Sequence, residues 1–316
     1  EFAGVAPAGP PPTYGGNINP LTGQTVADAG LVNRRPILVR YGNDRAARPH
    51  AGIAQADMVM EDLMEAFWIT RLTGVFLQNE PKQVGPVRSA RPVNIELLPA
   101  FDGVFVFSGA SIGVNQLLAR HSFDLIHEGH QGDLFFRSSQ RPAPHNLYTS
   151  IPAVRERIRA LGWERAVSFR GLSFGAEAPA GAPASRVHIP LPPTSTVVWT
   201  WDADAGVYRR WVQGEPYTDL LTGEQIGAQN VIVIYAKHWK SDIVEDSLGS
   251  RAIGIAVRGG ERAQVFRDGR LIEGYWWRDD PTLFFQLVDA NGRHIPLKPG
   301  QSWVQIVPTS YQLGIQ

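Results

Sequence analysis

Two short segments of the sequence combine arginine, serine and proline in a way that suits an anion-binding pocket. Residues 81–91 read PKQVGPVRSAR, and residues 137–149 read RSSQRPAPHNLYT. Proline holds the backbone extended or turned, so neither segment is expected to be helical. A guanidinium group donates two parallel hydrogen bonds to a carboxylate or phosphate, and neighbouring hydroxyls can orient the bound group. We expect these segments, called the first and second arginine loops below, to converge on one pocket.

The expected ligand contacts come from both arginine loops. The arginines would hold the anion, and the serine and asparagine side chains would orient it. The predicted ligand-binding residues are Arg88, Ser89, Arg91, Arg137, Ser138, Arg141 and Asn146. A simpler alternative is that the arginines pair with nearby carboxylates such as Glu61, Asp62 or Glu65.

His145 and Glu61 are the two candidate catalytic residues, both for proton transfer. His145 lies in the proline-rich part of the second arginine loop, and histidine changes protonation near neutral pH. A histidine beside proline is more often a structural hydrogen-bonding residue, which is the alternative for His145. Glu61 would share one face of a strand with Asp57 and Glu65. Two carboxylates facing a cleft could act as acid and base, although pairing with the arginines is the alternative.

The sequence predicts no metal site and no cofactor. His127-Glu128-Gly129-His130, with Asp133 nearby, invites a zinc hypothesis, but the spacing differs from HExxH on a helix and the glycines favour a solvated loop. Neither a phosphate-binding GxxxxGK[ST] nor a nucleophile-elbow GxSxG motif occurs. The sequence contains no cysteine, which excludes disulfides, iron–sulfur clusters and cysteine nucleophiles.

Charge and hydropathy limit the classes of partner. The formal net charge of the 316 residues is zero, which argues against a dedicated nucleic-acid-binding protein. No apolar run approaches the roughly 20 residues that a membrane-spanning helix needs. We therefore expect an anionic small molecule or a cell-wall polymer as partner, no nucleic acid, and membrane contact only through an N-terminal anchor lost upstream.

The patterning predicts a fold of the α+β or mixed α/β class with two folded parts. A buried strand at 103–109 followed by a helix at 111–121 is typical of an α/β unit. Strand-like segments also occur at 35–42, 56–63 and 69–78, and Ser150 caps a helix that ends near Gly162. The predicted parts are a flexible tether (1–18), an N-terminal mixed-sheet α/β domain (19–175), a Pro/Ala-rich linker (176–195) and a smaller β-rich C-terminal domain (196–316).

Several motifs resemble one bacterial family. GPVRSARP (85–92), the RSS…APHNLYTS stretch (137–150) and VFRDGRLIEGYW…IPLKPGQSWVQIVP (265–308) are similar to the YerB-like envelope lipoproteins, a domain of unknown function. The resemblance runs from about Asn19 to Pro308 and implies a lipid-anchored or secreted, extracytoplasmic protein. It implies no reaction and identifies no catalytic residue. The lipid-bearing cysteine of such a lipoprotein is absent from this sequence.

The function expected from these observations is binding of an anionic ligand by an envelope-associated, extracytoplasmic protein. A cell-wall glycan or a phosphate-bearing polymer would suit the arginine-rich loops. One alternative is a hydrolase acting on an envelope or extracellular polymer, with a carboxylate or His145 as acid and base. A second is a protein-interaction scaffold whose tryptophan-rich C-terminal half exposes an aromatic patch.

Overall fold

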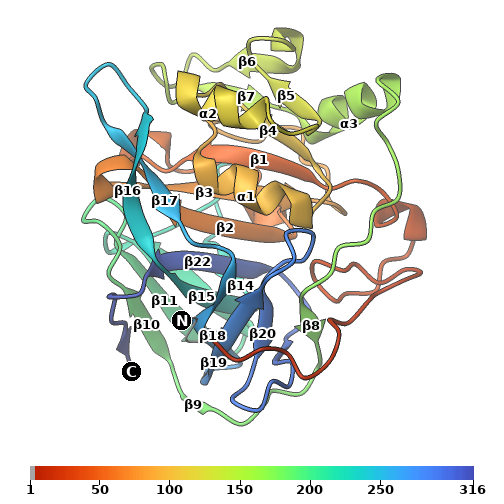
Figure 1. Cartoon of the computed structure of the whole chain (residues 1–316), viewed down its shortest axis with the longest axis vertical. Coiled ribbons are helices and arrows are strands. Elements are labelled where there is room, and N and C mark those ends of the chain that lie inside the picture. The colour runs from red at the N-terminus through yellow and green to blue at the C-terminus, as the bar shows by residue number, and fades with distance from the viewer. Residues whose placement is uncertain (1–3) are drawn as a thin grey trace.

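An eleven-stranded mixed sheet takes strands from both halves of the chain (Figure 1). The computed structural model describes residues 4–316, so residues 1–3 of the predicted tether lie outside the described residues. The sheet order is β20-β19-β18-β15-β22-β2-β3-β1-β4-β5, and β9 pairs with β19. Its strands are β1 (Ile37–Gly42), β2 (Met58–Leu63), β3 (Thr70–Phe76), β4 (Val104–Phe107), β5 (Leu125–His127), β9 (Ala182–Pro183), β15 (Asn230–Ala236), β18 (Gly259–Arg267), β19 (Arg270–Arg278), β20 (Gln286–Val288) and β22 (Ser302–Pro308).

The two halves of the chain meet in the middle of this sheet. Strand β22 pairs in parallel with β2 on one side and with β15 on the other. Strands β2 and β15 are buried at every position, and β22 at all but its last. Such apolar runs are typical of strands that are covered on both faces. Backbone hydrogen bonds therefore join the N-terminal and C-terminal parts directly.

A six-stranded antiparallel sheet packs on one face of the main sheet. It contains β10 (Arg186–Ile189), β11 (Val197–Asp202), β12 (Val207–Val212), β13 (Glu215–Pro216), β14 (Gly227–Ala228) and β23 (Gly314–Ile315). The segment 176–195, predicted as a linker, thus contributes β9 and β10. Val187 and Ile189 of β10 are fully buried and alternate with polar residues, a period-two strand signal obscured by the surrounding prolines.

The remaining strands form three two-stranded sheets, and the helices are short. The pairs are β6 (Phe135–Arg137) with β7 (Leu147–Thr149), β8 (Ser173–Phe174) with β21 (Pro296–Leu297), and β16 (His238–Val244) with β17 (Arg251–Ile255). The α-helices are α1 (Pro92–Leu97), α2 (Ile112–Leu118) and α3 (Ile151–Ala160). Single 3-10 turns occur at η1 (Ala29–Leu31), η2 (Arg45–Ala47), η3 (Ile53–Gln55), η4 (Glu65–Phe67), η5 (Leu98–Ala100) and η6 (Gly132–Leu134). None of the helices in residues 4–316 is long and apolar enough to cross a membrane.

Two hydrophobic clusters fill the two faces of the main sheet. Successive residues of β2 alternate between them: Met60 belongs to the cluster beneath α1 and α2, and Val59 to the cluster that faces the six-stranded sheet and α3. Trp199 and Trp303 meet edge-to-face in the second cluster, with ring centroids 5.4 Å apart. The predicted fold class is confirmed by this combination of a mixed sheet, a few helices and a β-rich second half.

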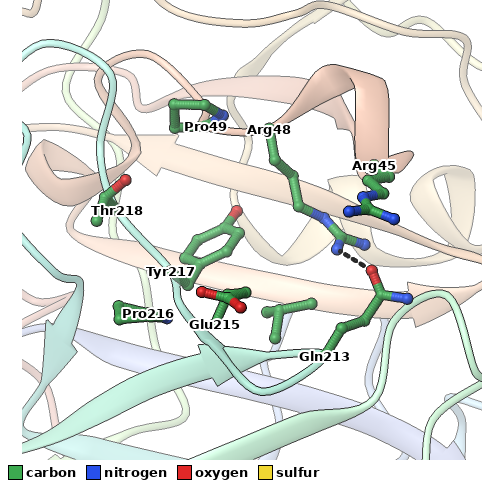
Figure 2. A pocket seen from close by; sticks show the side chains of 9 residues that line it. Arg45, Arg48, Pro49, Gln213, Glu215, Pro216, Tyr217 and Thr218 are labelled. Carbon is green, nitrogen blue, oxygen red and sulfur yellow. Dashed lines mark hydrogen bonds between the residues drawn. The ribbon is translucent and has the colours of Figure 1, made fainter.

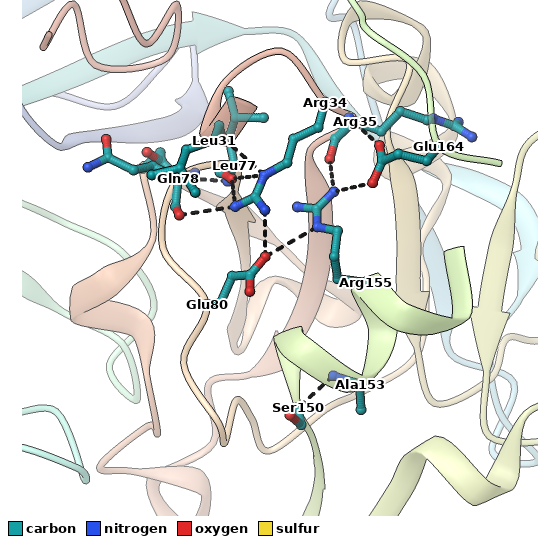
Figure 3. Close-up of polar contacts among 11 residues, drawn as sticks. Leu31, Arg34, Arg35, Leu77, Gln78, Glu80, Ser150, Ala153, Arg155 and Glu164 are labelled. Carbon is teal, nitrogen blue, oxygen red and sulfur yellow. Dashed lines mark hydrogen bonds and ion pairs between the residues drawn. The ribbon is translucent and has the colours of Figure 1, made fainter. Parts of the chain in front are cut away.

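The predicted capped helix is α3, and buried charges attach it to the sheet. Ser150 Oγ accepts from the Ala153 N–H, as expected for its cap. Arg155 Nη1 donates to Arg35 O at 2.5 Å, and Arg155 Nε lies 3.5 Å from Glu80 (Figure 3). Burial lowers the pKa of Arg155 to about 10.

The described part of the predicted tether lies against the C-terminal half. The Ala8 N–H donates to Gly292 O at 2.8 Å, and the Phe174 N–H donates to the Tyr14 hydroxyl at 2.8 Å. Gly4 approaches Gly260 so closely that a side chain at position 4 would clash with backbone. Residues 4–16 therefore follow the surface of the molecule as a strap.

A buried ion pair links the two sheets across the second cluster. Glu61 of β2 accepts from Arg210 Nη2 at 2.7 Å and from Gln305 Nε2 at 2.9 Å. Its other oxygen accepts from Asn43 Nδ2 and from the Thr70 hydroxyl. Both charged side chains are at most 1% exposed. The carboxylate is thus fully used inside the protein, so a substrate cannot reach it in this structure.

Replacing Glu61 alone should destabilise the protein strongly. Glu61→Ala leaves the Arg210 charge buried without a partner, which is expected to lower the free energy of unfolding by about 3–5 kcal/mol. Urea denaturation followed by circular dichroism measures this change. The exposed control Glu224→Gln should change it by less than about 0.5 kcal/mol. A Glu61→Ala variant as stable as the control would show that the pair does not stabilise the contact between the sheets.

Candidate functional site

The two arginine loops converge in space. Arg88 and Ser89 of the first loop and Arg137 of the second line one pocket of about 360 Å³, together with Ser108 at the end of β4. Backbone hydrogen bonds hold the loops together: the Val87 N–H donates to Leu147 O at 2.7 Å. Neither loop contains a helix, as their prolines predicted.

Arg88 is the cation with the most free hydrogen-bonding capacity in this pocket. Its Nη1 donates to Pro144 O at 3.3 Å, across to the second loop. Within residues 4–316, no carboxylate oxygen lies within 4.0 Å of its guanidinium nitrogens. Burial lowers the pKa of Arg88, and the charge of Asp44 opposes this effect. Arginine still remains protonated at neutral pH, so the pocket contains a positive charge without a direct ion pair.

Two serine hydroxyls lie beside this charge. Ser89 Oγ and Ser108 Oγ are 3.4 Å apart. The backbone around them is fixed, since the Ser108 N–H donates to Arg88 O and Arg71 Nη1 donates to Ser89 O. Ser108 was not among the residues predicted to bind a ligand. The signal for it was its position directly after the buried strand, where the carboxyl end of β4 opens toward the loops.

Arg137 lies at the rim of the pocket, where its charge is partly neutralised. Its side chain is 45% exposed, Nη2 donates to Glu128 at 2.7 Å and Nη1 donates to Asn146 Oδ1 at 3.0 Å. Asn146 and Ser138 exchange hydrogen bonds within the second loop: the Ser138 N–H donates to Asn146 O, and Asn146 Nδ2 donates to Ser138 O. These two residues shape the loop, and neither lines the pocket.

Arg91 does not point its charge into the pocket. It is 7% exposed and donates through Nε to Glu65 Oε2 at 2.8 Å and through Nη2 to the other oxygen of the same carboxylate. Glu245 lies 3.5 Å from Arg91 Nη1. The carboxylate pairing considered as the alternative for this residue is therefore what the structure contains.

Arg141 anchors the second loop to the segment after β1. Its Nη1 donates to Ala47 O at 2.6 Å and its Nη2 to Pro49 O at 2.8 Å. Both guanidinium ends are thus engaged by backbone carbonyls. Arg141 fixes the position of the loop that carries Arg137 and His145.

His145 lies beside Asp44, close to the arginines. Its Nδ1 is 3.7 Å from Asp44 Oδ2 and has no hydrogen-bond partner among the described residues. Burial lowers the pKa of His145, Asp44 opposes this, and Arg88 and Arg141 lower it further. A pKa below the ordinary value leaves the imidazole neutral at pH 7, as a general base requires. Its nearest carboxylate partner is Asp44, whereas the other candidate, Glu61, is enclosed between the sheets.

Two further features of the sequence have structural explanations. The rings of His127 and His130 lie against each other with centroids 4.3 Å apart and planes tilted by 39°. Among residues 4–316 no group of three or more His, Asp or Glu side chains is arranged to hold a metal ion. Trp199, Trp276 and Trp303 are at most 2% exposed. These three tryptophans cannot contribute to an exposed aromatic patch, but Trp239 in the same half is 45% exposed, so the scaffold alternative stays a prediction.

Comparisons with known proteins agree with the resemblance seen in the motifs. The family model "Protein of unknown function (DUF3048) N-terminal domain" matches residues 21–164, and its C-terminal counterpart matches residues 187–304. The YerB protein of Bacillus subtilis (strain 168), named as a candidate lipoprotein, is 31% identical over 294 residues, which cover 92% of this chain and 86% of that protein. The crystal structure of Bacillus subtilis YerB matches with a TM-score of 0.80 at 30% identity, covering 93% of this chain and 98% of that one.

Removing the charge of Asp44 should lower the pKa of His145 further. The carboxylate stabilises the imidazolium form, so Asp44→Asn leaves burial and the two arginine charges unopposed. Titration of the His145 ring protons by NMR measures the change. The pKa of His127 is the internal control, because its causes are burial and His130. An unchanged or raised His145 pKa would rule out the assigned contact.

Proposed function

The chain belongs to the DUF3048 family, whose two domain models together match most of it, and on this premise we propose that it binds an anionic ligand in the pocket between its arginine loops at the cell envelope. The name of its Bacillus subtilis relative supports the envelope location. The single observation that carries the binding proposal is the convergence of Arg88, Ser89, Ser108 and Arg137 on one pocket.

The charges around the pocket favour a monoanionic group. Arg88 and Arg137 contribute two positive charges, and Glu128, which also lines the pocket, contributes one negative charge. One net positive charge matches a phosphodiester or a carboxylate better than a dianion. A volume of about 360 Å³ accommodates one such group with part of its neighbours. The exposed rim at Arg137 leaves room for a longer polymer to continue into solvent, which suits a phosphate-bearing envelope polymer or an acidic glycan.

A hydrolase is the second candidate function, and His145 is the observation that favours it. A neutral imidazole with a free Nδ1 beside Asp44 has the environment of a general base. Pro144, its neighbour in the chain, lines the pocket. In this version Arg88 binds the anion and His145 activates a water molecule, while Glu61 takes no part.

Replacing Arg88 should weaken binding of a monoanionic polymer without unfolding the protein. We expect Arg88→Ala to bind a glycerol-phosphate oligomer roughly tenfold more weakly, because a charged hydrogen-bonding partner is lost. Arg137→Ala should have a smaller effect, since Glu128 already engages that side chain. Isothermal titration calorimetry at low and high salt measures both, and added salt should weaken wild-type binding most.

The matched control is Arg186→Ala, an exposed arginine of β10 outside the pocket. A galacturonate oligomer tested in parallel distinguishes carboxylate from phosphodiester recognition. Equal affinity of wild type and Arg88→Ala for both oligomers would refute the proposal. Release of new end groups by the wild type but not by His145→Ala would select the hydrolase over a binding protein.

A further inference from the structure

A second cavity is lined in part by the segment that follows β1. It has a volume of about 390 Å³ and shares no lining residue with the arginine-loop pocket. One wall is the segment containing Arg45 and Arg48, and the opposite wall is the hairpin of β12 and β13, with Gln213, Glu215 and Tyr217 (Figure 2). The two walls come from opposite halves of the chain.

Arg48 is a fixed positive charge in this cavity. Its Nη2 donates to Asn43 O at 2.7 Å and to Thr194 O at 2.6 Å, and its Nε donates to Asn43 Oδ1. Its Nη1 reaches Gln213 Oε1 at 3.3 Å, across the cavity (Figure 2). All these acceptors are neutral, so they hold the guanidinium in place without cancelling its charge. Burial lowers the pKa of Arg48, but arginine remains protonated at neutral pH.

Arg45 and Glu215 add exposed charges of opposite sign. Both side chains are exposed, and among the described residues neither lies within 4.0 Å of an oppositely charged group. Gln213 has a φ of 54° and Gly214 a φ of 83°, and this tight turn directs the chain back so that Glu215 lies on the hairpin wall opposite the arginines. The cavity therefore contains positive charge on one wall and negative charge on the other, without an ion pair between them.

A buried ion pair lies behind the hairpin and adds no net charge to the cavity. Arg210 is fully buried, its guanidinium carbon is 4.9 Å from the centre of the Tyr217 ring, and its Nε and Nη1 have no hydrogen-bond partner among the described residues. Its ion pair with Glu61 balances one charge. Arg48 has no such partner within 4.0 Å in residues 4–316, so an incoming carboxylate is favoured near it.

We propose that this cavity binds a small zwitterion, such as a dipeptide, with its carboxylate at Arg45 and Arg48 and its ammonium group at Glu215. A dipeptide carries an ammonium group and a carboxylate separated by a short backbone, which matches the opposite charges on the two facing walls. Val212 and Pro216 supply apolar surface for small side chains. The volume of about 390 Å³ suits a ligand of a few amino-acid residues. A purely anionic polymer fits this site less well, because it would meet Glu215.

The test compares three forms of one ligand. L-alanyl-L-alanine is titrated against N-acetyl-alanyl-alanine, which lacks the ammonium group, and alanyl-alaninamide, which lacks the carboxylate. NMR chemical-shift changes of the hairpin backbone amides report binding at this site, with ligand up to about 10 mM. We expect the free dipeptide to bind best and both blocked forms to bind roughly tenfold more weakly, as expected for loss of one charged contact.

Two exposed substitutions check which end each wall recognises. Glu215→Gln should abolish the preference for the free over the acetylated dipeptide, and Arg45→Ala should abolish the preference for the free dipeptide over the amide. Arg186→Ala and Glu224→Gln are controls with the same changes of charge outside the cavity. The proposal is overturned if no form shifts the hairpin amides, or if all three forms bind equally. Preferences that survive in both cavity variants would also overturn it.

Discussion

The need to neutralise two buried carboxylates on one central strand governs how this molecule is assembled. Glu61 and Asp62 are successive residues of β2, so they face opposite sides of the main sheet. Arg210 pairs with Glu61 from the six-stranded sheet, and Arg40 of β1 donates to both oxygens of Asp62. A buried charge without a partner is strongly unfavourable. Glu61 can therefore be buried only once the six-stranded sheet is aligned on β2, and Asp62 only once β1 is in place.

Other buried arginines also connect separate elements, but they donate to backbone carbonyls instead of carboxylates. Arg278 donates to the carbonyls of Glu96, Val257 and Leu283, and thereby ties α1 to the C-terminal strands. Each guanidinium group has five donors in a rigid plane, whereas a lysine ammonium is a single point. A chain with four lysines among its 30 basic residues is thus suited to cross-linking irregular backbone. The preference for arginine over lysine in this sequence therefore serves the packing of the fold as well as the pockets.

Local patterns in the sequence predicted the strands and helices and the convergence of the two arginine loops. They did not predict which carboxylate or carbonyl each arginine contacts. Buried strands and the Ser150-capped helix follow from apolar runs and capping residues. Arg88 and Arg91 have the same chemistry and lie three residues apart. Glu65, distant in the chain, engages Arg91 and leaves Arg88 for the pocket. Likewise, β2 pairs with β22 although Glu61 and Gln305 are 244 residues apart in the sequence. No local pattern predicts a contact over such a separation.

The central place of β22 has a consequence for biosynthesis. This strand belongs to the last part of the chain, yet it separates β2 from β15. Until it emerges from the ribosome, both neighbours have an unpaired edge, which is a template for wrong pairing with other chains. Closing a loop of 244 residues also opposes the final pairing by about 5 kcal/mol of chain entropy. The main sheet is thus completed only once β22 has been synthesised, and a newly made chain stays vulnerable to aggregation until this strand inserts.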